Sequence, residues 1–350
     1  MLTPREKTKP VYVKNIQIGG SKNVVIQSMC NTKTSDIAAT LEQIDGMVKE
    51  GCEIVRLAVP DMVAAKAFDK ICSSACVPVV ADIHFDYRLA LECIANGASK
   101  IRINPGNIGS MDRVKAVADA CRKNSVPIRI GVNMGSIDKD AERNFGRTPK
   151  AMVESAFMHI KLLNKFDFDD IVVSLKASDV PKTVEAYKIM SEKCNYPLHI
   201  GVTEAGTAYS GLIKSAMGIG SLLLDGIGDT IRVSLTAPPV EEVTAAKYIL
   251  RSAGIKTGGI EFVSCPSCGR CRINQVEIAN LVERHLSKID KPLKVAVMGC
   301  AVNGPGEAKD ADIGIAGGDG CAILFKKGVI IKKIPEEDII KTLIEEIEEM

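Results

Sequence analysis

The chain has 350 residues, enough for two domains with separate hydrophobic cores. Apolar residues make up 46% and charged residues 25%, as in ordinary globular proteins, and a net charge of +2 gives no reason to expect binding to nucleic acid or a membrane surface. The first ten residues, MLTPREKTKP, are too polar for a secretory signal, and no apolar run approaches the roughly 18–20 residues of a membrane span. We therefore expect a cytoplasmic protein.

Short runs rich in β-branched residues recur along the first two thirds of the chain, and a helix-like segment follows each. Runs of this kind are typical of parallel strands that are buried on both faces. Eight alternations of strand and helix predict a TIM (β/α)8 barrel. A doubly wound open sheet is the alternative, but no GxGxxG follows the first run. The predicted strands are 24–29, 53–58, 78–84, 100–106, 127–133, 170–176, 198–206 and 229–235.

Polar residues stand near the carboxyl ends of these predicted strands, where a TIM barrel has its active site. Cations outnumber carboxylates among them, and arginine forks and lysine suit phosphate oxygens. No GxxxxGK[ST] loop is present, so a small phosphorylated metabolite fits better than a nucleotide in a P-loop. A layer of internal salt bridges is the structural alternative. The residues are Arg56, Asp82, His84, Arg102, Asn104, Arg129, Asn133, Lys176, Glu204 and Arg232. Glu204, in the turn GVTEAG, is the carboxylate that we expect to deliver a proton.

A glycine-rich stretch, GIKTGGIE (254–261), suits a linker, so we expect domains at 1–253 and 254–350. The second predicted domain is a small α+β module. It contains a cysteine-bearing turn, a helix at 274–287, strands at 294–298 and 312–315, a hairpin over 321–334, and an acidic amphipathic helix over 335–350.

Four of the twelve cysteines gather in this second module, whereas the other eight stand singly in mostly apolar or helical patterns. Cys265, Cys268 and Cys271 recur every third residue, and Cys300 closes the predicted strand KVAVMGC. This spacing can hold a cubane iron–sulfur cluster, although four thiolates could also bind structural zinc. Glu307, in the following turn NGPGE, is an alternative ligand that is harder and more exchangeable than thiolate.

Two segments of this module, CPSCGR (265–270) and MGCAVNGPGEAKDADIGIAGG (298–318), resemble the C-terminal part of the 4-hydroxy-3-methylbut-2-enyl diphosphate synthases, bacterial two-domain enzymes of non-mevalonate isoprenoid synthesis. The resemblance extends over nearly the whole chain through RINPGN (102–107), GVNMGS (131–136) and GVTEAG (201–206). It implies a TIM barrel that binds the substrate diphosphate, followed by a cluster domain similar to that of sulfite reductases.

The resemblance also implies a chemistry. A 4Fe–4S cluster would be held by Cys265, Cys268, Cys300 and Glu307, with Cys271 as a nearby free thiol. The enzyme would reductively open and dehydroxylate 2-C-methyl-D-erythritol 2,4-cyclodiphosphate with two electrons from ferredoxin or flavodoxin, and Glu204, Asp82, His84 and Glu307 would be its catalytic residues. A head-to-tail homodimer is implied as well.

Two other functions remain open at this point. One is a non-redox barrel transferase of the pteroate-synthase type, in which a cluster would be purely structural. The other is a non-catalytic iron–sulfur carrier or sensor, which would bind no phosphorylated metabolite at the barrel.

Overall fold

The computed structural model describes residues 2–255, 258–286, 289, 291–301, 306 and 308–350. The chain divides into two compact units, Met1–Ile255 and Lys256–Met350, and each is described by itself. Within the described residues, no helix combines the length and the apolar character needed to cross a membrane.

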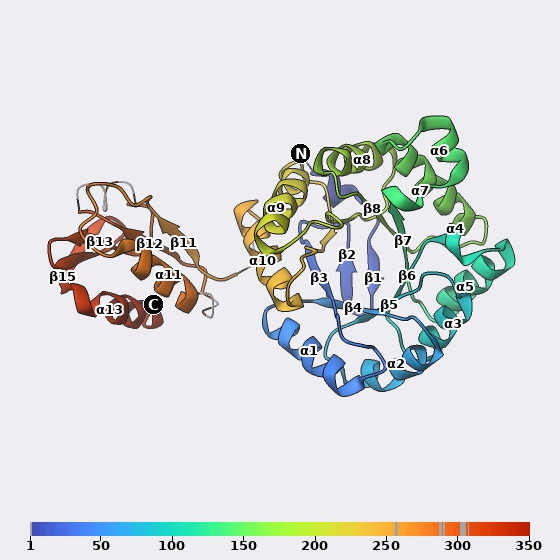
Figure 1. The fold of residues 1–350 in the computed structure, drawn as a ribbon, viewed down its shortest axis with the longest axis horizontal. Coiled ribbons are helices and arrows are strands. Elements are labelled where there is room, and N and C mark those ends of the chain that lie inside the picture. Colours follow the sequence, from blue (N-terminus) through green and yellow to red (C-terminus); the bar gives the residue numbers. More distant parts are fainter. Residues whose placement is uncertain (1, 256–257, 287–288, 290, 302–305, 307) are drawn as a thin grey trace. The chain divides into compact units, whose positions relative to one another are not determined.

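The first unit is a TIM barrel, as the alternating pattern predicts (Figure 1). Its strands are all parallel and hydrogen-bonded in the order β8-β7-β6-β5-β4-β3-β10-β9, and an isolated bridge between Val173 and Leu198 links β8 to the region of β9. The strands are β3 (Val25–Met29), β4 (Ile54–Ala58), β5 (Val79–Asp82), β6 (Lys100–Ile103), β7 (Ile128–Asn133), β8 (Ile171–Lys176), β9 (His199–Ile200) and β10 (Thr230–Ile231).

Helices surround this sheet and bury their apolar faces against it. Several begin directly after an aspartate whose carboxylate accepts a backbone N–H of the first turn, as Asp36, Asp61 and Asp179 do. The helices are α1 (Ile37–Lys49), α2 (Met62–Ser74), α3 (Tyr87–Ala95), α4 (Pro105–Ile108), α5 (Met111–Lys123), α6 (Lys139–Phe145), α7 (Pro149–Asn164), α8 (Val180–Lys193), α9 (Ala208–Leu224) and α10 (Pro239–Ser252), with short 3-10 turns η1 (Pro4–Lys7) and η2 (Met134–Ser136).

A hairpin that the sequence analysis did not predict, β1 (Val11–Val13) and β2 (Ile16–Ile18), lies across the amino-terminal end of the barrel (Figure 1). Its buried Val13 and Ile18 pack against the first residues of the barrel strands, Val25 and Ile54 among them. This end is therefore closed by apolar side chains, which leaves the carboxyl end for a polar site.

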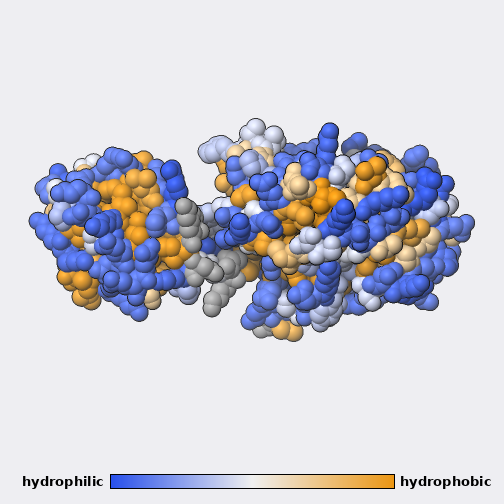
Figure 2. All heavy atoms as spheres, turned by 90° about the horizontal axis from the view of Figure 1, so that it is seen from below, coloured by the Kyte–Doolittle hydropathy of each residue, from blue (hydrophilic) through white to orange (hydrophobic). Residues whose placement is uncertain are grey.

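The second unit is a five-stranded sheet in the order β11-β12-β13-β14-β15, with β11 to β13 parallel and the remaining pairs antiparallel. Helices α11 and α13 share one hydrophobic core with the sheet, and a smaller core includes Ala308, Ala311 and Phe325. The face shown in Figure 2 has hydrophilic surface around smaller apolar areas on both units. The elements are β11 (Glu261–Ser264), α11 (Gln275–Leu286), β12 (Lys294–Met298), β13 (Ile313–Gly318), β14 (Cys321–Lys326), β15 (Val329–Pro335), η3 (Glu336–Asp338) and α13 (Ile339–Glu348).

The α+β character of this unit matches the prediction, and three of its details differ. Strand β11 was not predicted, because the glycine-rich stretch before it suggested a linker. Strand β13 extends to Gly318, beyond the predicted end at 315. The final α-helix begins at Ile339 rather than 335, because β15 includes Pro335 and a 3-10 turn follows it.

Candidate functional site

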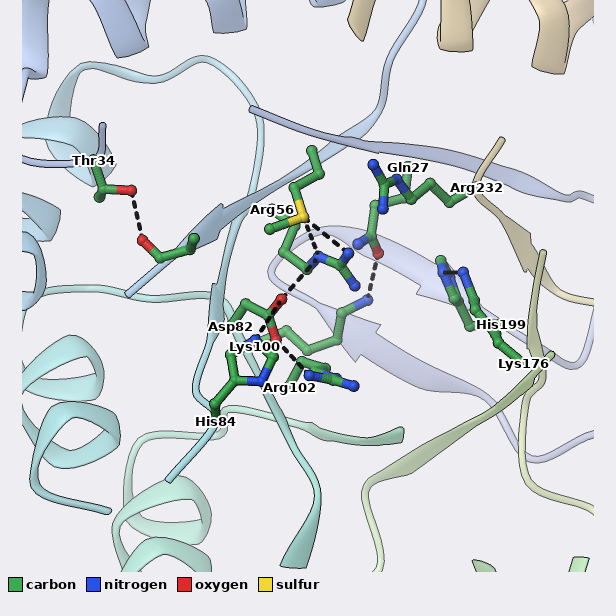
Figure 3. Close-up of polar contacts among 12 residues, drawn as sticks. Gln27, Thr34, Arg56, Asp82, His84, Lys100, Arg102, Lys176, His199 and Arg232 are labelled. Carbon is green, nitrogen blue, oxygen red and sulfur yellow. Dashed lines mark hydrogen bonds and ion pairs between the residues drawn. The ribbon is translucent and has the colours of Figure 1, made fainter. Parts of the chain in front are cut away.

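Asp82 lies at the centre of a buried cluster of arginines inside the barrel (Figure 3). Arg102 Nη1 donates to Asp82 Oδ1 at 3.0 Å, and Arg56 Nε lies 3.5 Å from Oδ2. The strand register explains the contact, because Asp82 on β5 is the direct Cα partner of Arg102 on β6. Burial alone would raise the pKa of the Asp82 carboxyl, yet Arg56 and Arg102 outweigh it and lower that pKa to about 2. Asp82 is therefore ionised at neutral pH and holds both guanidinium groups in place.

A second carboxylate, Glu242, reaches the same interior from helix α10 and was missed by the sequence analysis. Its carboxylate accepts from Arg232 Nη2 at 3.2 and 3.3 Å, from Ser28 Oγ at 2.8 Å and from the backbone N–H of Leu235 at 3.0 Å. Only 4% of Glu242 is exposed. A helix-borne residue gives no strand-end signal in the sequence, although Glu242 stands four residues before Ala246, on the buried side of α10.

Several cations in the same interior lack a carboxylate partner among the described residues. Arg129 is 1% exposed, and its Nε and Nη1 atoms have no hydrogen-bond partner in the part of the chain that the structure describes. Lys100 is fully buried and donates to Gln27 Oε1 at 3.3 Å, while Lys176 Nζ lies 3.4 Å from His199 Nε2 (Figure 3). Burial, reinforced by the neighbouring cations, lowers the pKa of Lys100, Arg129 and Lys176. Uncompensated buried charge of this kind is costly unless an anion neutralises it.

Two glycines make room for these cationic side chains. A Cβ at Gly131 would lie 2.6 Å from Arg102 Nε, and one at Gly201 would lie 2.8 Å from Lys176 Nζ and 2.5 Å from the Arg232 carbonyl oxygen. The first glycines of GVNMGS and GVTEAG therefore serve the close packing of the arginine and lysine side chains inside the barrel.

Four of the predicted residues lie at the carboxyl-end rim of the barrel, at or after the last residues of their strands. His84 has a 56% exposed side chain, and its Nε2 lies 3.8 Å from Asp82 Oδ2. Asn104 caps helix α4, because its Oδ1 accepts the N–H of Gly106 at 3.1 Å. Asn133 ends β7 and is half-buried, and its backbone N–H donates to Ser136 Oγ. Glu204 is exposed and has a left-handed backbone with φ of 52°.

The structure thus brings the predicted Arg56, Arg102 and His84 each within 4 Å of the Asp82 carboxylate, and Arg129 and Lys176 into the same buried interior. Arg232 is separately anchored by Glu242. Lys100, His199 and Gln27, which the sequence analysis did not select, belong to the same interior. Lys100 precedes Arg102 by two residues on one strand, so both side chains point to the same face. This spacing could have identified Lys100 from the sequence.

In the second unit, the cysteine turn folds against the carboxyl end of β12. Cys265 follows β11, whose last residue Ser264 pairs with Val297 of β12, and the N–H of Arg272 donates to the Gly299 carbonyl oxygen at 2.9 Å. The Cys265 sulfur lies within hydrogen-bond distance of the Gly299 N–H, at 3.4 Å, and of Gln275 Nε2, at 3.2 Å. The turn is therefore held beside the segment that carries Cys300.

The sulfur atoms of this turn have the chemistry of cluster ligands. N–H donors already point at Cys265, and hydrogen bonds from the backbone and side chain of Arg270 lower the pKa of the exposed Cys268 thiol. Such donors favour the thiolate form that binds iron. Cys271 Sγ instead lies 3.1 Å from the Ile273 carbonyl oxygen. Glu307 lies outside the described residues, and within those residues no three His, Cys, Asp or Glu side chains form a group that could hold a metal ion. The three predicted thiol ligands that are described, Cys265, Cys268 and Cys300, are of the donor type that iron–sulfur clusters take.

Comparison with known families decides the assignment. A model of the GcpE TIM-barrel domain matches residues 8–247, and a model of the GcpE protein C-terminal domain matches residues 261–349. The chain belongs to the GcpE family. This confirms the family resemblance that the sequence motifs indicated.

Two similar relatives carry the name 4-hydroxy-3-methylbut-2-en-1-yl diphosphate synthase (flavodoxin). The protein of this name from Ruminiclostridium cellulolyticum is 57% identical over 347 residues, which cover 99% of this chain and 98% of the relative. The one from Clostridium perfringens is 57% identical over 345 residues, which cover 98% of this chain and 99% of the relative.

Two solved structures match 70% of this GcpE chain in fold. A type I 3-dehydroquinate dehydratase from Clostridium difficile matches with a TM-score of 0.52 and 13% identity, covering 70% of this chain and 98% of that one. The dihydropteroate synthase of Yersinia pestis matches with a TM-score of 0.50 and 13% identity, over 70% of this chain and 98% of that one. At such identity the likeness is one of fold, so the pteroate-synthase alternative gains no support from it.

Proposed function

We propose that the chain is a 4-hydroxy-3-methylbut-2-en-1-yl diphosphate synthase of the non-mevalonate isoprenoid pathway, and that its substrate is 2-C-methyl-D-erythritol 2,4-cyclodiphosphate. In this reaction a carbon–oxygen bond of the ring breaks, one hydroxyl oxygen leaves as water, and two electrons and two protons are taken up. The observation that carries the proposal is the group of buried basic side chains inside the barrel, Arg129, Lys100 and Lys176, for which the described residues supply no carboxylate partner.

The barrel, residues 1–253, would bind the diphosphate. Arg56, Arg102, Arg129, Lys176 and Arg232, with Asn104 and Asn133 at the rim, are the proposed contacts. Guanidinium groups bind phosphate oxygens through paired N–H donors, and the desolvated interior strengthens each contact. Asp82 and Glu242 hold three of these arginines before the substrate arrives, so little binding energy is lost in ordering them.

Proton delivery to the leaving oxygen falls to residues at the rim. Glu204 is exposed in the loop that follows β9, on the carboxyl-end side of the barrel, and His84 lies beside Asp82. Asp82 would serve catalysis by positioning the two arginines, since its low pKa leaves it without a proton to donate at neutral pH.

The second domain, residues 254–350, would hold a 4Fe–4S cluster through Cys265, Cys268, Cys300 and Glu307. When bound, the cluster would supply the electrons one at a time. Gln275 and the Gly299 N–H would orient the Cys265 sulfur, and Cys271, which contacts Ile273 and Gln275, would remain a free thiol.

Electrons would come from flavodoxin, as the names of the relatives state for those proteins, or from ferredoxin. We further propose a head-to-tail homodimer in which the cluster domain of one subunit serves the barrel of the other. The twelve free cysteines suit a reducing compartment, so we place the enzyme in the cytoplasm.

Electron paramagnetic resonance of the anaerobically purified, reduced protein tests the proposal. Adding the cyclodiphosphate should change the spectrum, because the substrate would lie next to the cluster. Cys271→Ser is the matched control, and it should keep both the iron content and the response to the substrate. A spectrum unchanged by substrate that is independently shown to bind would contradict the reductase mechanism. Protein purified with zinc and without iron would also contradict the mechanism, because it would have no redox centre.

A further inference from the structure

Lys176 differs from most arginines of the proposed diphosphate site in the group that holds it. Three of those arginines are held by the carboxylates of Asp82 and Glu242. In the described part of the chain, the Lys176 ammonium group has one hydrogen-bond partner, the imidazole of His199, with Nζ 3.4 Å from Nε2 (Figure 3). Lys176 is only 8% exposed, so this contact decides where its charge lies.

Strand β9 and the residue after it form the surface on which Lys176 rests. His199 and Gly201 are two residues apart, so they face the same side of the chain. A Cβ at Gly201 would lie 2.8 Å from Lys176 Nζ and 3.4 Å from its Cε. The end of the lysine side chain therefore lies against β9, where Gly201 leaves the space and His199 supplies the hydrogen-bond acceptor.

The backbone ladder between β8 and β9 is interrupted at the same level. The N–H of Val173 donates to the Pro197 carbonyl oxygen at 2.9 Å. In a regular parallel ladder, the N–H of Leu175 would bond next to the carbonyl oxygen of His199. The Tyr187 hydroxyl from α8 lies between them instead, because it accepts the Leu175 N–H at 3.0 Å and donates to the His199 oxygen at 2.6 Å. Side chains, and not a direct backbone bond, thus join the two strands here.

Both ring nitrogens of His199 have partners, although the residue is fully buried. The strand register pairs His199 with Thr230 on β10, and Nδ1 lies 3.4 Å from Thr230 Oγ1. An ammonium group has no lone pair, so Nε2 accepts from Lys176, and Nδ1 carries the ring proton and donates to the hydroxyl. Burial and then the nearby Arg129 and Lys176 lower the pKa of His199, which keeps the imidazole uncharged and able to accept.

We propose that His199 is the positioning residue of Lys176, and that the chain of contacts from Thr230 through His199 fixes the place where the ammonium group meets a phosphate oxygen. The inference rests on the proposed function for the role of Lys176. A lysine side chain has many rotamers, so holding one of them before the substrate arrives reduces the entropy lost on binding. A histidine that only filled space would be replaced without loss of binding by leucine, which packs well in a core.

Nitrogen NMR of the full chain, labelled in its four histidines, tests the contacts directly. The signals of His199 are those that disappear in His199→Gln. We expect a proton on Nδ1, an unprotonated Nε2 at pH 7, and a changed Nε2 signal in Lys176→Met. A proton on Nε2 would overturn the proposal, because the lysine would then lack its acceptor. This measurement needs no substrate, so it is decisive whether or not the proposed reaction is correct.

Calorimetric titration with the cyclodiphosphate tests the consequence for binding. His199→Leu should raise the dissociation constant about tenfold. His199→Gln should recover most of that loss, because its amide oxygen accepts from Lys176. In a Lys176→Met background, His199→Leu should add little further loss. In turnover, His199→Leu should raise KM and leave kcat nearly unchanged, since the contact with the diphosphate is present before and during the reaction.

His285→Leu is the matched control, because that histidine has a 44% exposed side chain in the second unit, and it should bind like wild type. A folded His199→Leu variant that binds like wild type would overturn the proposal. So would losses that add to those of Lys176→Met, or a glutamine variant no better than the leucine variant. In each of these cases the wild type still binds the cyclodiphosphate, whereas a wild type that does not bind it would overturn the proposed function itself.

Discussion

The carboxylate of Asp82 positions two arginines of the proposed site, although Asp82 itself is not expected to react with the substrate. Burial alone would raise its pKa, yet Arg56 and Arg102 lower that pKa to about 2, below the usual value of 3.8. A group with a depressed folded-state pKa stabilises the protein above its unfolded-state pKa, and this contribution is lost as the pH falls toward the folded-state value.

Replacing Asp82 by asparagine should lower the free energy of unfolding by about 3 kcal/mol at neutral pH, because two buried arginines lose their partner. The difference between wild type and variant should shrink below about pH 4 and be mostly gone near pH 2, as the wild-type carboxylate gains its proton. Denaturant unfolding across this pH range measures it, with the exposed Asp45→Asn as control. A difference that stays constant down to pH 2 would contradict the assigned pKa.

Glu242→Gln should weaken binding of the cyclodiphosphate about tenfold, equivalent to about 1.4 kcal/mol, because Arg232 loses its charged partner. In an Arg232→Gln background the same change should have little further effect, since Glu242 acts through that arginine. Calorimetric titration of the four proteins provides the double-mutant cycle. The neighbouring, exposed Glu241→Gln should bind like wild type, and additive losses would show that Glu242 does not act through Arg232.

At the scale of elements, the barrel strands carry glycines where cationic side chains from neighbouring strands need space. Gly131→Ala on β7 should displace Arg102, whose Nε lies 2.6 Å from the new Cβ position. The displaced arginine would lose its hydrogen bond to the buried Asp82 carboxylate, so we expect a lower melting temperature and clearly weaker substrate binding. Gly135→Ala, where no atom lies within 4 Å, is the control. Equal binding by both variants would contradict the role given to Arg102.

The strand-and-helix pattern was enough to predict the barrel, because buried parallel strands have a β-branched composition that stands out. Hairpin β1–β2 was missed because its strands have three residues each, too few to show a period. Arg56, Arg102, Arg129 and Lys176 were found because they lie on predicted strands, where alternate side chains point to the same face. Glu242 was not found from the sequence, because it lies on a helix. Tertiary packing decides which side of that helix faces the barrel interior.

At the scale of the whole molecule, the proposed function divides the chemistry between the two units. The cysteine spacing and the motifs around Cys300 are sufficient to indicate a cluster domain, because the spacing of candidate ligands can be read directly from the amino-acid sequence. The contacts of Cys265 with Gln275 and Gly299 could not be predicted, since they join a turn to the end of a distant strand. The role of Glu307 as a cluster ligand stays a prediction.

Anaerobic turnover tests the central claim, that an anion-binding barrel and a cluster domain together reduce a cyclic diphosphate. Reduced flavodoxin and the cyclodiphosphate would be mixed with the purified enzyme, and the product followed by phosphorus NMR. We predict one product per two electrons, no product without a reductant, and a Cys300→Ser variant that still binds substrate in the barrel but does not convert it. Turnover without a reductant, or full activity in Cys300→Ser, would contradict the account.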